Sequence, residues 1–280
     1  MKKAFLSIAT VALLFVGTEM AQAQVKLPPA SSTTTITQGL GIKNISLTYQ
    51  RPNMNGRKIF GTLVPYNEVW RTGANNIPSI TFQEEVTIEG NTVPAGTYGL
   101  FTIPSANEWT VVLSKNPKQW GAYQYKPEED FLRFKVKPQK LADQVETFTI
   151  TFDDVTPKST KLSMAWENTK IGFTIQTDQS KEIMASIDQA MQGEKKPYFQ
   201  AAQYYFNNNL DIKKAAEWVK SADQGNTGAP HIKYWKSRIL NKSGDKDGAR
   251  KAAQEGIEMA TKANNGEYIK LNTQALNEAK

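Results

Sequence analysis

Arginine, aromatic and amide side chains are concentrated in one irregular segment, QRPNMNGRKIFGTLVPYNEVWRTGANN, at residues 50–76. A guanidinium group binds a carboxylate or a phosphate through two parallel hydrogen bonds, so the three arginines of the segment suit an anionic ligand. The indole of Trp70 adds a stacking face for a sugar or a cation. The segment therefore predicts a binding site for an anionic or carbohydrate ligand. Its predicted ligand-binding residues are Arg51, Arg57, Trp70, Arg71, Asn75 and Asn76.

A second concentration, NPKQWGAYQYKPEEDFLRFKV at residues 116–136, combines aromatic and acidic side chains. We expect Trp120 and Tyr123 to form the rim of the binding site, with a hydrophobic rim that closes one end of the β-region as the alternative. The acids suggest another chemistry, because a glycosidase needs two carboxyl groups roughly 5 to 10 Å apart. The candidates for such a pair are Glu68, Glu129 and Asp130.

The same side chains also have a purely structural interpretation. An arginine in a long loop can donate to backbone carbonyl groups and pin the loop, while the aromatic rings fix it to the sheet. This alternative stays open for Arg57 and Trp70. It is weaker for Arg71, because Asn75 and Asn76 nearby add polar groups that would all need partners.

The absence of cysteine and the presence of a single histidine exclude several catalytic classes. Thiol catalysis, thiolate zinc sites and iron–sulfur clusters all need cysteine, and a zinc site with three histidines needs more imidazole than the chain has. The phosphate-binding pattern GxxxxGK[ST] is also missing from the sequence. We therefore predict no cofactor and no bound metal.

The N-terminus, MKKAFLSIATVALLFVGTEMAQAQ, has the features of a secretory signal peptide. Two lysines precede an apolar run that is too short to span a membrane comfortably, and the tripeptide AQA forms a cleavage site. We expect cleavage after Ala23, which removes residues 1–23 and leaves a periplasmic or secreted protein with no membrane span. The net charge of +7 is moderate. The sequence has no run of five or more like charges, which would have indicated nucleic-acid binding.

The two segments must be positioned by β-strands. Apolar residues alternate with polar ones in ISLTYQ, EWTVVLS, ETFTITFDD and KLSMAW, which is typical of antiparallel strands with one buried face. About nine short strands without intervening helices predict an antiparallel β-sandwich, and a partly closed barrel is the competing architecture. We assign residues 24–40 to an N-terminal extension with the first strand, and residues 41–177 to the sandwich.

Residues 178–280 change to a helical period and predict an all-α domain of helical hairpins. A weak 34-residue repeat relates Phe206 to Leu240 and Ala215 to Ala249, and it resembles tetratricopeptide repeats. An ordinary helical bundle is the alternative. Because helix-pair repeats present concave surfaces to other proteins, we expect this tail to bind a protein partner.

Three strings carry a resemblance to a known family: YQRPNMNGRKIFGTLVPYNEVWRTGANN, VPAGTYGLFTIPSANEWTVVLSKNPKQWGAYQY and DFLRFKV. Over roughly residues 30–177 the chain resembles the domain-of-unknown-function 2911 family of exported bacterial proteins. The resemblance implies an exported β-rich domain. It also implies that the Arg-Pro, Gly-Arg, Trp-Arg and Gly-Ala-Asn positions matter to the family. It implies no activity, and it does not extend to the helical tail.

Three functions fit these observations. The preferred interpretation is an exported, non-enzymatic module that binds an anionic or carbohydrate ligand and carries a partner-binding tail. One alternative is a structural scaffold, in which both motif-rich segments only brace the sandwich. The other is a hydrolase that acts on envelope glycan through paired carboxylates.

Overall fold

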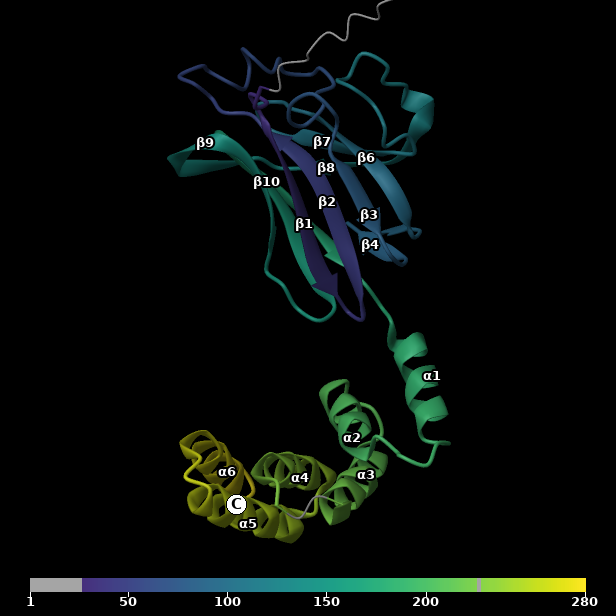
Figure 1. Cartoon of the computed structure of the whole chain (residues 1–280), viewed down its shortest axis with the longest axis vertical. Helices are drawn as coiled ribbons and strands as arrows, with labels where there is room; N and C mark the ends of the chain where they lie inside the picture. The colour runs from purple at the N-terminus through teal and green to yellow at the C-terminus, as the bar shows by residue number, and fades with distance from the viewer. Residues whose placement is uncertain (1–26, 226–227) are drawn as a thin grey trace, which may run out of the picture. The chain divides into compact units, whose positions relative to one another are not determined.

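A computed structural model describes residues 27–225 and 228–280 of the chain. The chain divides into two compact units between Gln176 and Thr177, called here the β unit and the helical unit (Figure 1). The expected signal peptide and its cleavage site lie outside the described residues. Within the described ranges, no helix is long and apolar enough to cross a membrane.

The β unit contains two antiparallel sheets, which together hold ten strands in the described part of the chain. The larger sheet has six strands in the order β1-β2-β3-β6-β7-β8. Their bounds are β1 (Ser32–Leu40), β2 (Lys43–Arg51), β3 (Ser79–Phe82), β6 (Gly96–Ile103), β7 (Trp109–Ser114) and β8 (Asp130–Val136).

The smaller sheet has four strands in the order β5-β4-β10-β9. Their bounds are β4 (Val86–Ile88), β5 (Asn91–Val93), β9 (Gln139–Asp153) and β10 (Ser159–Gln176). Apolar side chains from both sheets form one continuous core, so the architecture is the predicted β-sandwich, with ten strands where the sequence suggested about nine.

The alternating pattern of each strand decides which side faces this core. In β2, Ile45, Leu47 and Tyr49 are buried, while Ser46 and Thr48 lie on the outer face. The phenol of Tyr49 also joins the two sheets, because it donates to the carbonyl of Ile150 at 3.2 Å and accepts from that residue's amide at 2.9 Å. The sheets are thus held together by apolar burial and by a buried hydrogen-bonded pair.

The outer face of the larger sheet is lined with hydroxyl groups. Threonines at positions 33, 35 and 37 alternate with the inward-facing residues of β1. Cross-strand pairs join the hydroxyls of Thr35 and Thr48 at 2.9 Å, and those of Thr81 and Thr97 at 2.9 Å. In β1, β2 and β3 this face is therefore rich in uncharged hydrogen-bonding groups, which matters for the second cavity described below, whereas Arg133 and Lys135 of β8 are exposed on the same face.

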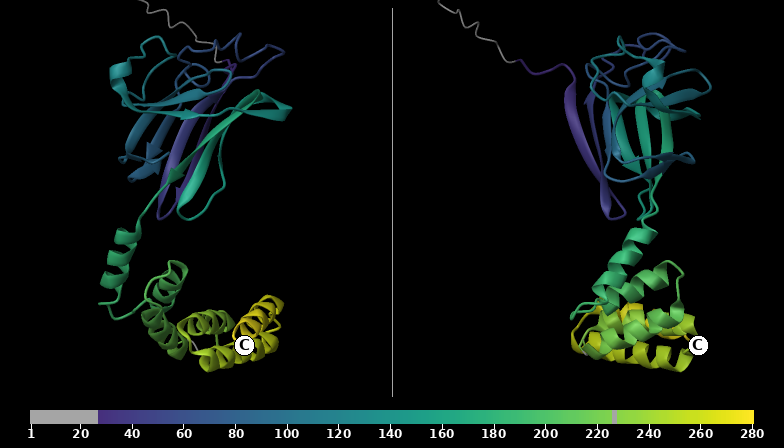
Figure 2. Two further views of the ribbon diagram at one scale, coloured as in Figure 1. Left: turned by 180° about the vertical axis from the view of Figure 1, so that it is seen from behind. Right: turned by 90° about the vertical axis from the view of Figure 1, so that its right-hand side faces the viewer.

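Two long connections gather at one end of the β unit, called here the loop end (Figures 1 and 2). Residues 52–78 join β2 to β3, and residues 115–129 join β7 to β8 and include the short 3-10 helix η1 (Pro127–Glu129). An isolated bridge between Asn76 and Trp120 connects the two segments. The two motif-rich segments of the sequence are therefore neighbours in space.

The helical unit contains six helices in its described residues. They are α1 (Ser180–Ala190), α2 (Tyr198–Asn207), α3 (Ile212–Gly225), α4 (Pro230–Ser243), α5 (Lys246–Lys262) and α6 (Gly266–Glu278). Buried alanines at 202, 215, 216 and 249 share a core with Val219 and Leu240, so the helices approach closely. Successive helices from α2 to α6 pack on one another.

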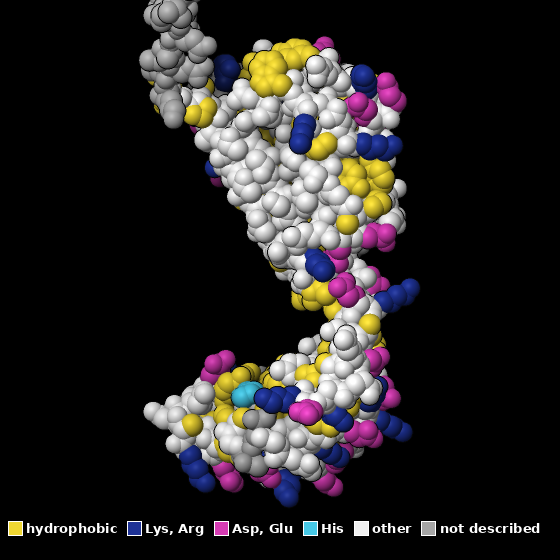
Figure 3. Space-filling view, turned by 45° about the vertical axis from the view of Figure 1, so that its right-hand side comes forward, with side chains coloured by type: hydrophobic (Ala, Val, Ile, Leu, Met, Phe, Trp, Pro, Cys, Tyr) yellow, Lys and Arg dark blue, Asp and Glu magenta, His cyan; other side chains and the backbone are white. Residues whose placement is uncertain are grey.

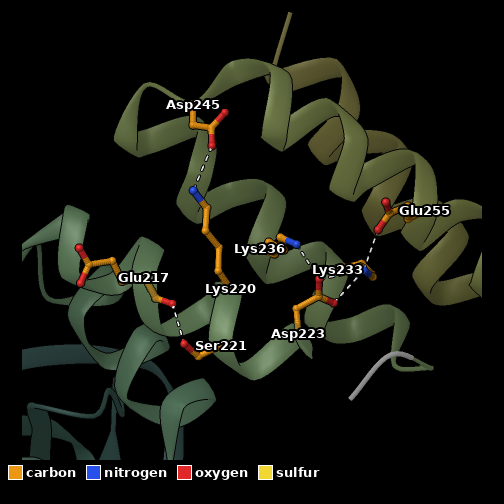
Figure 4. A network of polar contacts seen from close by, with 8 residues as sticks. All are labelled: Glu217, Lys220, Ser221, Asp223, Lys233, Lys236, Asp245 and Glu255. Atoms are coloured by element: carbon orange, nitrogen blue, oxygen red, sulfur yellow. Dashed lines mark hydrogen bonds and ion pairs between the residues drawn. The ribbon is translucent and has the colours of Figure 1, made fainter. Parts of the chain in front are cut away.

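A buried ionic network stabilises the contact between α3, α4 and α5 (Figure 4). The ammonium group of Lys233 lies 2.9 Å from Asp223 Oδ2 and 2.6 Å from Glu255 Oε2. Lys236 also binds Asp223 Oδ2, at 2.5 Å. The side chains of Asp223 and Lys233 are only 9% and 8% exposed, so each charge depends on its partners. Lys220, which binds Asp245 at 3.3 Å, is half exposed.

Removal of Asp223 should destabilise the helical unit much more than removal of Lys220. Asp223→Ala removes one of the two carboxylates that bind the buried ammonium of Lys233, and breaking a buried ion pair costs roughly 3 kcal/mol or more. Lys220→Ala breaks an exposed pair that contributes at most about 1 kcal/mol. Urea denaturation followed by far-ultraviolet circular dichroism measures both. Similar losses in the two variants would contradict the structural importance of the buried network.

Acid should weaken the helical unit through the same aspartate. Burial alone would raise the pKa of Asp223, but hydrogen bonds from Lys233 and Lys236 outweigh it and hold this pKa below its ordinary value. The ionised Asp223 therefore stabilises the helical unit fully above the pKa of an aspartate in the unfolded chain, about 3.9. This stabilisation is lost as the pH falls through the lower pKa of Asp223 in the folded chain.

Denaturation midpoints measured between about pH 5 and pH 2 should fall more steeply in the natural chain than in Asp223→Asn, which has no carboxyl group there to protonate. Parallel pH profiles would assign the acid sensitivity to other groups.

Candidate functional site

The loop end contains a cavity of about 600 Å³, called here the Arg71 cavity. Its wall comes mainly from residues 52–74, with contributions from Ala122 and Tyr123 of the second connection and from Trp166 of β10. Of the predicted ligand-binding residues, the structure brings together at this cavity Arg57, Trp70, Arg71 and Tyr123. Its charged lining residues in the described chain are Arg57, Glu68 and Arg71.

Trp70 anchors the wall of the Arg71 cavity in the sandwich core. Its side chain is 8% exposed, and its ring stacks on Trp166 with 5.8 Å between centroids. The rings of Phe60, Trp109 and Phe148 contact it edge to face. Such a cluster adds about 0.5–1.5 kcal/mol per aromatic pair to the free energy of burial. Most of the indole therefore stabilises the core, although Trp70 also borders the cavity.

The backbone on both sides of Arg71 is fixed. The amide of Trp70 donates to the carbonyl of Thr102 at 2.8 Å, and the amide of Thr102 donates back at 3.1 Å, so residue 70 is bridged to β6. Thr72 is fully buried and has a φ of 56°, a left-handed conformation that is rare for a β-branched residue. Such a conformation costs about 1–3 kcal/mol and persists only where the surroundings enforce it.

The hydroxyl of Thr72 holds the residue in this conformation, because it donates to the carbonyl of Trp70 at 3.2 Å and forms a hydrogen bond with the hydroxyl of Thr102 at 3.0 Å.

Four of the nine described non-glycine residues with positive φ lie in the connection between β2 and β3. They are Asn55, Asn67, Thr72 and Asn75. Strained backbone concentrates at binding sites, where it holds side chains in one geometry. Arg71 is thus carried on a rigid support.

The guanidinium group of Arg71 makes no hydrogen bond and no ion pair with the described residues, and its Nε is fully buried. A buried donor without a partner costs about 1–3 kcal/mol, so nearly all such donors in folded proteins bind a protein group, water or a ligand. Here the group lines a cavity that is large enough to admit a ligand. Arg71 is therefore the side chain of the loop end most clearly available for binding.

The other two arginines are committed to protein partners. Arg57 donates through Nε to the carbonyl of Met54 at 2.8 Å and through Nη2 to that of Asn53 at 2.6 Å, while also lining the cavity. Arg51 donates to the carbonyl of Phe148 at 3.3 Å and to Thr149 Oγ1 at 2.9 Å. Arg51 lines neither cavity and joins the end of β2 to β9.

A second cavity, of about 520 Å³, lies beside the first connection and is called here the Trp120 cavity. It is bordered by Thr33, Thr48 and Ser79 from the outer face of the larger sheet, and by residues 117–120. Asn76 also lines it, and the backbone N–H of Asn76 donates to Gln50 Oε1 at 2.9 Å. The structure thus places four of the predicted residues at the Arg71 cavity and two, Asn76 and Trp120, at the Trp120 cavity, while Arg51 and Asn75 line neither. Asn75 lines neither cavity, and its carbonyl accepts from the amide of Gly121 at 2.7 Å.

Trp120 and Tyr123 form a stacked and exposed pair between the two cavities. Their ring centroids are 5.7 Å apart at an interplanar angle of 23°. They are 63% and 79% exposed, and Trp120 lines one cavity while Tyr123 lines the other. Figure 3 shows hydrophobic side chains at the surface of this end of the β unit. Exposed aromatic rings of this size are typical of binding surfaces.

The predicted carboxylate pair does not come together in either cavity. Glu68 is the single acidic lining residue of the Arg71 cavity among those described, and Glu129 and Asp130 line neither cavity. Asp130 binds Arg133 and accepts from the hydroxyl of Tyr125 at 2.9 Å. Burial and the hydrogen bond to Asp130 raise the pKa of Tyr125 to about 12. These groups form a structural network at the start of β8.

The sequence did not single out Gln119 or Thr72. Gln119 lines the Trp120 cavity and is only 4% exposed, and its Oε1 is buried without a partner among the described residues. The alternating threonines at 33, 35 and 37 were the one available hint that a polar sheet face borders this cavity. No pattern in the sequence indicates the strained backbone at Thr72.

Metal-binding clusters of three or more acidic or histidine side chains do not occur in the ranges that the structure describes.

Comparison with known proteins supplies a family and no activity. A family model described as protein of unknown function (DUF2911) matches residues 31–175. No curated protein and no solved structure matches the chain. The match stops before the helical unit, so the resemblance to tetratricopeptide repeats is not confirmed and stays a prediction.

The two arginines at positions 51 and 71 should behave oppositely on removal. Arg51→Ala loses two charge-assisted hydrogen bonds to β9, so the stability of the β unit should fall by roughly 2 kcal/mol. Arg71→Ala removes a donor that has no protein partner, and the change should stay below about 1 kcal/mol. Amide hydrogen exchange in β9 measures both variants of the full chain. A large loss for Arg71→Ala would show that this arginine braces the loop as Arg51 does.

Proposed function

This chain belongs to the DUF2911 family of proteins of unknown function, and we propose that its β unit binds a small anionic ligand in the Arg71 cavity. The observation that carries the proposal is the unpaired guanidinium of Arg71, whose Nε is buried beside an open cavity. A carboxylate or phosphate oxygen would satisfy this donor with a charge-assisted hydrogen bond.

The lining of the cavity narrows the class of ligand. Its described charged side chains are two arginines and one glutamate, which leave one net positive charge when all are ionised. This charge suits a ligand with one negative charge, or one whose further acidic groups point away from Glu68. The cavity volume of about 600 Å³ lies within the range typical of small-molecule sites.

The geometry favours binding over hydrolysis. A glycosidase requires a second carboxyl group near the first, and Glu68 has no acidic companion among the described residues of this cavity. The scaffold alternative explains Arg51 and the core position of Trp70 well. It gives no reason for a rigid support that holds an arginine without a protein partner, because an apolar side chain there would be less costly.

Two further expectations belong to this proposal. We expect the signal peptide predicted at residues 1–23 to direct the chain out of the cytoplasm, so that the ligand is a periplasmic or extracellular anion. The helical unit remains the part expected to bind a protein partner. Neither expectation is needed for the anion site itself.

Binding of anions should depend on Arg71 and not on Arg51. Isothermal titration of the full chain with phosphate, citrate and glucuronate provides probes of three chemistries. Loss of one charge-assisted hydrogen bond is worth about 1.5–3 kcal/mol, so Arg71→Ala should weaken the best probe by at least about tenfold. Arg51→Ala removes the same positive charge as Arg71→Ala, and this variant should bind the best probe nearly as tightly as the natural chain does.

Two results would contradict the anion site. One is equal affinity in Arg71→Ala and the natural chain. The other is the absence of binding by all probes, together with a large loss of stability in Arg71→Ala, which would favour the scaffold.

A further inference from the structure

The Trp120 cavity differs in chemistry from the Arg71 cavity. Its lining carries hydroxyl and amide groups, and Lys118 is its one charged side chain among the described residues. Neutral polar groups of this kind hydrogen-bond to neutral ligands, and the charge of Lys118 is on a side chain that is exposed to solvent and therefore screened. The cavity is therefore built for a ligand rich in hydroxyl groups. The residues with such groups are Thr33, Thr48, Gln50, Asn76, Ser79 and Gln119.

Gln119 gives the cavity an unsatisfied acceptor. The residue is 4% exposed, and its Nε2 donates to the carbonyl of Asn116 at 3.2 Å and to Glu129 Oε2 at 3.4 Å. These bonds fix the amide so that Oε1 is the free end, and this oxygen is buried without a partner among the described residues. A buried carbonyl oxygen without a donor is unfavourable by about 1–3 kcal/mol, and a ligand hydroxyl would relieve it.

Trp120 gives the cavity an aromatic wall that stays exposed. Its 63% exposed indole is held by the backbone bridge to Asn76 and by the stack on Tyr123. Gly121 permits this arrangement, because its φ is 72° and a Cβ atom there would lie 2.7 Å from the Tyr123 ring. Together with the exposed ring of Tyr123, the indole of Trp120 forms an apolar surface patch, a feature that marks ligand-binding sites.

A close approach fixes the segment that carries these groups to the sheet. Gly99 of β6 has no side chain, and a Cβ atom there would lie 2.8 Å from the carbonyl oxygen of Asn116 and 3.2 Å from Pro117. The segment before Gln119 therefore rests directly on the outer face of the sheet. Thr48 and Ser79, which are opposite each other in the backbone register of β2 and β3, line the same cavity.

We propose that the Trp120 cavity binds an uncharged pyranose residue of a carbohydrate. The apolar face of the sugar ring stacks on the indole of Trp120, one sugar hydroxyl donates to Gln119 Oε1, and the others bond the hydroxyls of Thr33, Thr48 and Ser79. The combination of one aromatic face with a row of neutral hydrogen-bonding groups matches a sugar ring, which has one apolar face and a rim of hydroxyls. This site is independent of the proposed anion site.

Sugar binding should depend on Trp120 and not on Arg71. The probes are glucose, N-acetylglucosamine and the linear tetrasaccharide of each, and isothermal titration calorimetry measures their binding to the full chain. Trp120→Ala should weaken the best probe at least tenfold, and the exposed position of this ring makes the variant safe for folding. Gln119→Met, which keeps the volume and removes the acceptor, should weaken it several-fold.

The control variants separate the two sites. Arg71→Ala should leave sugar affinity unchanged, and Trp120→Ala should leave anion affinity unchanged, because neither residue lines the other cavity. A tetrasaccharide that binds tighter than its monosaccharide would identify a glycan chain as the ligand, and equal affinity would identify a single sugar. Absence of binding by all four sugars at millimolar concentration, or affinity that survives Trp120→Ala, would overturn the proposal.

Discussion

The burial of Trp70 is the constraint on which the loop end depends. An indole is among the largest apolar groups a chain can bury, and here it lies among Phe60, Trp109, Phe148 and Trp166, between the two sheets of the sandwich. Because its backbone is also bridged to Thr102, the chain on either side has little freedom. The irregular connection is thus an extension of the core, and Arg71 is held where the core ends.

This arrangement separates stability from binding along a short piece of chain. Side chains that point into the sandwich or across to β9 have protein partners, as Arg51 does with Phe148 and Thr149. Two polar atoms of residues that line the cavities, Arg71 Nε and Gln119 Oε1, are buried without a partner within the described chain. The stacked rings of Trp120 and Tyr123 lie between the two cavities. One end of a rigid sandwich can therefore present an anion site and a sugar site side by side.

The sequence predicted the fold better than the site, for a physical reason. Alternation within a strand is local, so patterns such as ISLTYQ reveal the buried face without knowledge of the partner strand. The role of an arginine depends on contacts that are distant in sequence. Arg51 and Arg71 look alike in the sequence, yet Arg51 bonds to residues almost a hundred positions away and Arg71 bonds to none of the described residues. Gln119 and the strained Thr72 carry no local signature, since burial and backbone geometry arise only from tertiary packing.

We propose that the protein holds Arg71 ready for an anion that the protein itself does not supply. A crystal structure of the full chain grown with selenate would test this directly, because the anomalous signal of selenium locates the anion without ambiguity. We expect selenate in the Arg71 cavity, hydrogen-bonded to the Arg71 guanidinium while the backbone of Trp70 and Thr72 keeps its conformation. An Arg71 side chain bonded to a protein carbonyl or carboxylate, with selenate bound elsewhere or not at all, would contradict it.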